Sequence, residues 1–175
     1  MHSILVALIA GSASLVSYGS NVILNFSFLG VTFDGANNQK DWKFQVLKKA
    51  EIPGHPELAL VIGTPNILSG VYIYITQKNG KNVGIIYTFP FTESQKIEAG
   101  LVQSYGPPLD SRATTWQTTY GQIVQGEELM WQTSAGDMLF DNRSEDMHLG
   151  RLVINPTEAL EGNAVLRGVP TTNFH

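Results

Sequence analysis

The chain has 175 residues, of which 43% are hydrophobic, and a formal net charge of −4. It is therefore long enough to bury the core of one domain, and wholesale disorder is excluded. Its lysines are scattered in short groups, which argues against nucleic acid as a partner, since phosphate binding needs a basic face. The absence of cysteine excludes a disulfide scaffold, thiolate metal sites and lipidation at cysteine.

The N-terminus carries a short apolar run. Residues 4–10 are apolar, and small residues follow up to Ala13. This order is typical of a signal peptide, although no lysine or arginine precedes the run. The alternative is a buried first strand or a short core helix. We expect residues 1–13 to be a signal peptide, and we expect no transmembrane span, because a bilayer requires about 20 apolar residues.

Strand signals follow in the first third of the chain. Hydrophobic residues predict a strand over 21–33 and a loop at 35–39. Alternation favours a further strand beginning at Trp42, with a helical conformation of its lysine-rich end as the alternative. Residues 57–62 are compatible either with two helical turns or with a short buried strand.

The sharpest local signal is the pair Asn79-Gly80, which lies between two β-rich runs. Both residues tolerate the positive φ of a two-residue hairpin turn, so we expect a hairpin over 70–89. Counting outward from the turn, a regular ladder places three tyrosines on one face and isoleucines on the other. That face is either a second packed layer or an exposed surface that binds a protein or peptide partner. The candidate binding residues on it are Tyr72, Tyr74 and Tyr87.

A helix is predicted over residues 93–105. Thr92 and Gln95 have the spacing of a capping box, in which each side chain bonds a free backbone N–H of the first turn. Gly106 and the prolines after it end the helix. Residues 58–65 repeat the Leu…Gly-x-Pro pattern of residues 101–108, which suggests duplicated helix–stop–strand units.

The rest of the chain predicts more sheet. Strands are expected at 113–119, 127–133, 138–142 and 149–154, separated by turn residues. Asn155 and the proline after it begin a short helix that Gly162 ends. We therefore expect an α+β fold, an antiparallel sheet with the helix 93–105 packed on one face and tandem helix–strand units as a further option. The single domain spans 14–162, and residues 163–175 form a loosely held tail.

No catalytic or metal-binding motif is present in the sequence. The four histidines lie far apart, and no pair has metal-ligand spacing. His148 lies near Asp141 and two further acids, but the calcium-loop pattern fails there, so a solvated acidic turn is the better interpretation. Asp110 and Arg112 are expected to form a surface pair. We expect no catalytic residue, no metal and no cofactor.

A resemblance to a known group rests on six residues. The sequence combines Gly-x-Pro motifs with tryptophans on the strands that follow them. In this combination it resembles small exported bacterial α+β modules of the β-lactamase-inhibitor-protein type, which include outer-membrane assembly lipoproteins. The matching residues are Gly63, Pro65, Gly106, Pro108, Trp116 and Trp131. The lipidated cysteine of the lipoproteins is absent. The resemblance implies a non-catalytic binder that uses its sheet face.

Our leading functional hypothesis is therefore an exported, non-enzymatic binding or envelope assembly module, located in the periplasm or secreted. The alternatives are a small hydrolase, whose site is assembled from distant loops, and a purely structural domain. A histidine within hydrogen-bonding reach of a buried carboxylate would favour the hydrolase. Both tryptophans are expected to fill the core.

Overall fold

The computed structural model describes residues 22–23, 26–33, 39–52, 55–65, 71–117, 120–144 and 148–155. The predicted signal peptide, most of the loop at 35–39, the short helix after Asn155 and the tail at 163–175 lie outside these residues.

The described residues form eleven strands, one α-helix and two short 3-10 helices. In chain order the elements are β1 (Val22–Ile23), β2 (Ser27–Phe28), β3 (Val31–Thr32), η1 (Gln39–Asp41), β4 (Gln45–Ile52), β5 (His55–Thr64), β6 (Tyr72–Lys78), β7 (Lys81–Pro90), η2 (Phe91–Glu93), α2 (Ser94–Tyr105), β8 (Asp110–Gln117), β9 (Ile123–Thr133), β10 (Gly136–Asp141) and β11 (Leu149–Ile154).

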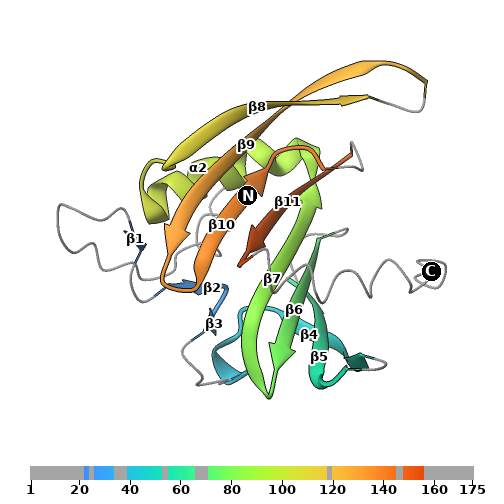
Figure 1. Ribbon diagram of the computed structural model, residues 1–175, viewed down its shortest axis with the longest axis vertical. Helices are drawn as coiled ribbons and strands as arrows, with labels where there is room; N and C mark the ends of the chain where they lie inside the picture. The colour runs from blue at the N-terminus through green and yellow to red at the C-terminus, as the bar shows by residue number, and fades with distance from the viewer. Residues whose placement is uncertain are drawn as a thin grey trace.

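Nine of these strands form one twisted sheet in the order β1–β9–β10–β11–β7–β6–β5–β4, and β8 also pairs with β9 (Figure 1). The pairing of β1 with β9 is parallel, and the other pairs are antiparallel. The main sheet is therefore mixed but rich in antiparallel pairs. Strands β2 and β3 form a separate two-stranded ribbon.

The prediction of an α+β fold with tandem helix–strand units was wrong. The described part of the chain is dominated by sheet and contains a single α-helix. Residues 57–62, for which two helical turns and a short buried strand were the two alternatives, lie in β5, which pairs with β4 on one side and β6 on the other. Two flanking strands satisfy its backbone groups, and Val61 is fully buried, so tertiary pairing selects the buried strand over the helical turns. The strand expected over 21–33 is also interrupted, by a turn at Leu29-Gly30 with positive φ.

The predicted helix 93–105 is confirmed as α2, although its start differs from the prediction. The capping box at Thr92 does not form: Glu93 is the N-cap residue, and it makes no side-chain cap hydrogen bond. A 3-10 turn at Phe91–Glu93 leads directly into the helix instead. The predicted stop is confirmed, since Gly106 has a φ of 82° and its N–H donates to Val102 O.

Alternate residues of the sheet divide it into two faces. The core face carries a large buried cluster that also includes Ile97, Leu101 and Tyr105 of α2. Its central members from the sheet are Ile73, Ile75, Ile85, Tyr87, Phe89, Phe140 and Leu152. The opposite side, called the second face below, carries a small separate cluster of Ile86 and Val153, with Tyr74 packed against it. None of the described helices is long and apolar enough to span a membrane.

Candidate functional site: the second face of the sheet

The β6–β7 hairpin forms around the predicted turn, but its register differs from the prediction. Asn79 and Gly80 have φ values of 51° and 77°, as the turn requires. The ladder shifts after two residue pairs, because Gln77 lies opposite Asn82 whereas Thr76 lies opposite Gly84. Val83 is therefore an extra residue in β7, a β-bulge. Beyond it, every β7 side chain lies on the face opposite to the one predicted.

The bulge separates the three candidate tyrosines. Tyr72 lies opposite Thr88 and Tyr74 opposite Ile86, whereas Tyr87 lies opposite Ile73. The prediction that the tyrosines share one face was therefore wrong. Only Tyr72 and Tyr74 lie on the second face, and their role in binding stays a prediction.

Tyr87 is a core residue that is 5% exposed. Its ring meets Phe28 edge-on at 5.4 Å and lies 5.8 Å from the ring of Phe89. Burial, with a smaller contribution from the charge of Glu93, raises the pKa of Tyr87 to about 12. The raised pKa agrees with the burial of this ring in the core.

Tyr72 and Tyr74 are half-buried neighbours on β6, with ring centroids 6.4 Å apart. Tyr74 packs against the small cluster of Ile86 and Val153. Burial, and secondarily the neighbouring Tyr72, raises the pKa of Tyr74. The pair thus presents two partly accessible rings beside an apolar support.

Directly opposed residues of six neighbouring strands continue this face as a line, called the polar row below. The strand registers place each member opposite the next, from β8 through β9, β10, β11 and β7 to β6. Its members are Arg112, Glu128, Asp141, Arg151, Thr88 and Tyr72. The row thus begins with charged side chains and ends at one of the candidate tyrosines.

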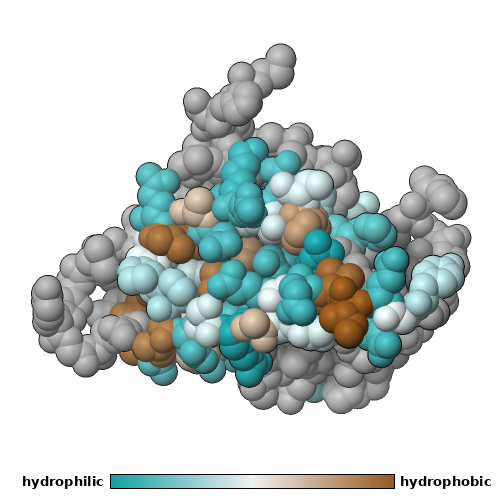
Figure 2. Space-filling view, turned by 90° about the horizontal axis from the view of Figure 1, so that it is seen from above, coloured by the Kyte–Doolittle hydropathy of each residue, from teal (hydrophilic) through white to brown (hydrophobic). Residues whose placement is uncertain are grey.

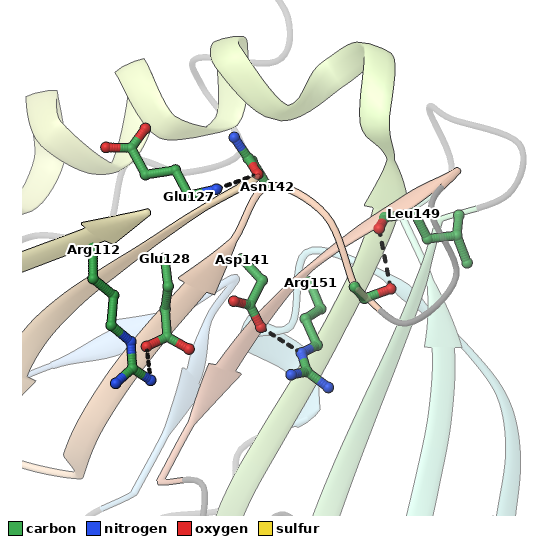
Figure 3. Close-up of polar contacts among 8 residues, drawn as sticks. Arg112, Glu127, Glu128, Asp141, Asn142, Leu149 and Arg151 are labelled. Carbon is green, nitrogen blue, oxygen red and sulfur yellow. Dashed lines mark hydrogen bonds and ion pairs between the residues drawn. The ribbon is translucent and has the colours of Figure 1, made fainter. Parts of the chain in front are cut away.

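Two carboxylates lie side by side in the polar row, and an arginine on the outer side of each neutralises it (Figure 3). Arg112 forms an ion pair with Glu128, and Nε of Arg151 donates to Oδ2 of Asp141 at 2.7 Å. Glu128 and Asp141 are directly opposed carboxylates, an arrangement that repels unless cations compensate it. The outer arginines supply that compensation. Asp141 is 3% exposed, so its charge especially needs the partner.

Hydrogen bonds of the backbone and of the Asn142 and Ser144 side chains fix the strand end beside this row. The N–H of Glu127 donates to Oδ1 of Asn142 at 2.8 Å, and the N–H of Asn142 donates to O of Glu127 at 3.1 Å (Figure 3). Ser144 Oγ donates to O of Leu149 at 3.0 Å and so ties the chain after β10 to the start of β11. These bonds hold β9, β10 and β11 in the register that brings the charged side chains together.

Two polar predictions need correction. Arg112 pairs with Glu128 across the strands rather than with Asp110, and Oδ1 of Asp110 accepts the N–H of Ser111 at 2.9 Å. Asp141 is buried and ion-paired rather than part of a solvated acidic turn. The nearby His148 is exposed. Asp141, Glu128 and Arg151 were missed as a set because no local pattern links residues on three different strands.

The two tryptophans have different environments. Trp131 is 2% exposed, and its Nε1 donates to O of Gly106 at 3.0 Å, so the core prediction is confirmed for it. Trp116 is half-buried on the second face, over Gly126. A Cβ at Gly126 would lie 2.7 Å from Oγ1 of Thr114 and 3.4 Å from Nε1 of Trp116. The contact with Thr114 is closer than a Cβ can make, so glycine allows that side chain to lie this close to β9.

The described residues contain no group of three or more histidine, aspartate or glutamate side chains placed to hold a metal ion. Comparisons with protein-family models, with curated proteins and with solved structures gave no match. The resemblance to β-lactamase-inhibitor-like modules therefore stays a prediction, and the helical part of its first unit is replaced by strand β5.

Proposed function

We propose that this protein is a non-enzymatic binding or assembly module that contacts a protein or peptide through Tyr72 and Tyr74. The observation that carries the proposal is the half-buried ring pair at the end of the polar row. Amphipathic rings offer apolar contact area and a hydrogen-bonding hydroxyl at low entropic cost, so they suit interfaces.

The neutralised polar row supports binding rather than catalysis. A general base or acid needs a carboxyl group that can exchange a proton with substrate. Asp141 is the buried carboxylate among the described residues, and Arg151 occupies its Oδ2. The hydrolase alternative thus gains no support from this face of the sheet.

Binding is tested with a matched pair of tyrosine variants. Tyr74→Ser removes a ring of the proposed surface, and Tyr120→Ser removes a ring that is 94% exposed on the β8–β9 hairpin. The immobilised wild-type protein is used to isolate a partner from envelope extract, and the purified partner is then titrated against each variant. A hot-spot aromatic contributes about 2 kcal/mol or more, so Tyr74→Ser should weaken binding roughly 30-fold.

Tyr120→Ser should leave the affinity unchanged in the same titration. Equal affinities of both variants and the wild type would refute the proposed surface. A urea melt of each variant checks that a loss of affinity does not come from unfolding.

We also propose export, based on the apolar run at residues 4–10 and the small residues after it. The intact mass of protein purified from its native host tests this proposal. A mature chain beginning near Ser14 supports export. A chain that still carries residues 1–13 contradicts it.

A further inference from the structure

The main sheet has two long edge strands, β4 and β8, and they are protected to different degrees. An exposed strand edge offers unpaired N–H and C=O groups to another chain, and lysines and bulges are the usual protection. Strand β4 has Lys48 and Lys49 and two register shifts against β5. Strand β8 pairs with β9 over its whole length without a shift, and it contains neither lysine nor proline.

The unprotected strand is also exposed to solvent. Ser111, Ala113, Thr115 and Gln117 are all exposed. The outer half of the β8–β9 hairpin extends beyond β10, whose pairing with β9 begins only at Glu128 (Figure 1). Leu109 and Ile123, at the two ends of this hairpin region, are 46% and 67% exposed.

The hydrogen-bonding direction of β8 follows from that of β9. O of Glu127 accepts the N–H of Asn142 from the β10 side. Because this direction alternates along an antiparallel strand, Gly126 and Glu128 bond to β8 instead. Their opposite residues Thr114 and Arg112 are then turned toward β9.

Ser111, Ala113 and Thr115, which alternate with these two residues along β8, consequently turn their N–H and C=O groups away from the sheet. The N–H of Ser111 donates to Oδ1 of Asp110 at 2.9 Å, which fits this direction. Within the part of the chain that the structure describes, no strand pairs with this side of β8, and the outward groups of Ala113 and Thr115 form the centre of this edge, called the free edge below.

We propose that β8 pairs antiparallel with β8 of a second copy of this chain, around a two-fold axis at Thr114. This register places Ala113 of one copy opposite Thr115 of the other, so the outward groups of both copies meet. It also places Arg112, whose side chain is 67% exposed, opposite Trp116 of the second copy. A guanidinium group against an indole ring is a favourable cation–π pair.

A second copy fits this edge better than other occupants. Asp110 and Arg112 balance each other in charge on β8, so two copies of the strand do not repel. The paired register brings Leu109 of one copy near the exposed Tyr120 end of the other hairpin. Figure 2, which looks onto this end of the molecule, shows separate hydrophobic groups among hydrophilic side chains. Pairing of β8 with β4 would be head-to-tail and open-ended, whereas β8 with β8 closes as a dimer.

Cysteine crosslinking tests the register directly, because the chain has no cysteine of its own. In Thr114→Cys the two new thiols lie opposite each other across the axis, at a non-hydrogen-bonded pair, where side chains approach most closely. Under mild oxidation this variant should form a disulfide-linked dimer in high yield. Ala113→Cys is the matched control, since its thiols lie off the axis and should crosslink several-fold less.

Light scattering of the wild-type protein is the second measurement. The average molecular mass should rise from that of the monomer toward twice that value as the protein concentration increases from about 1 to about 100 µM. The variant Thr115→Lys, which places a charge on the free edge, should stay monomeric over this range. The control variant Leu47→Lys, on β4, should dimerise like the wild type. A monomeric wild type throughout this range, equal crosslinking at residues 113 and 114, or dissociation by Leu47→Lys alone would overturn the proposal.

Discussion

The two faces of the main sheet are built from alternate residues of the same strands, yet they have different contents. The core face gathers Ile73, Tyr87 and Phe140 into one large buried cluster with α2. The second face has only a small apolar cluster around Ile86, with the polar row beside it. The comparison shows that large buried side chains lie on one side of the sheet, whereas half-buried rings and paired charges lie on the other side, for which we propose recognition. The first three predictions below test this separation, and the fourth concerns a carboxyl group on α2.

The largest effect is expected from Tyr87→Ala on the core face. The substitution leaves a cavity beside Phe28 and Phe89, and removal of a buried aromatic ring costs about 4 kcal/mol. Urea melts measure the free energy of unfolding. Tyr72→Ala, on the second face, is the matched control and should cost much less; equal losses would show that the two faces are equivalent.

Asp141→Asn should have the next largest effect. It leaves the Arg151 guanidinium without its charged partner, and because that side chain is still 30% exposed the cost should be about 2 kcal/mol rather than that of a fully buried pair. Glu128→Gln is the comparison, since its partner Arg112 is largely exposed and such pairs contribute less than about 1 kcal/mol. A larger loss of stability in Glu128→Gln would contradict the inference that the buried Asp141 depends on its ion pair more than Glu128 does.

Tyr74→Ser should destabilise the protein by about 1 to 2 kcal/mol. Tyr74 is half-buried against Ile86 and Val153, so the cost should lie between that of a surface change and that of a core cavity. Chemical denaturation measures it directly. A loss as large as that of Tyr87→Ala would mean that Tyr74 is a core residue, and the recognition role proposed for it would fail.

The smallest effect concerns Glu98 on α2. Burial, and secondarily the charge of Glu127, raises the pKa of Glu98 above its ordinary 4.5. The folded state then binds more protons than the unfolded state, so the free energy of unfolding falls as the pH rises through the interval above 4.5. Glu98→Gln removes this loss and should be more stable than wild type at about pH 7 but not at about pH 4. Urea melts at the two pH values measure the difference in the free energy of unfolding between the variant and the wild type. An equal difference at both pH values would contradict the prediction.

Local chemistry determined several elements from the sequence alone. Asn79 and Gly80 specify the hairpin because few other residues adopt the required positive φ. Gly106 specifies the end of α2 for the same reason, and the strands β8 to β11 follow from hydrophobic runs separated by turn residues. Each of these signals lies within a few residues of the feature that it predicts.

Tertiary structure decided the rest, because the deciding partners are distant in the sequence. The bulge at Val83 places Tyr87 in the core. The turn residues predict the first residue pairs of the hairpin, but they do not predict an extra residue beyond those pairs. Residues 58–64 became strand because β4 and β6 pair with them on both sides. The polar row joins residues as distant as Tyr72 and Arg151, which only the strand order brings to one face. Register is a property of the whole sheet, so the candidate site could be seen only once the sheet was assembled.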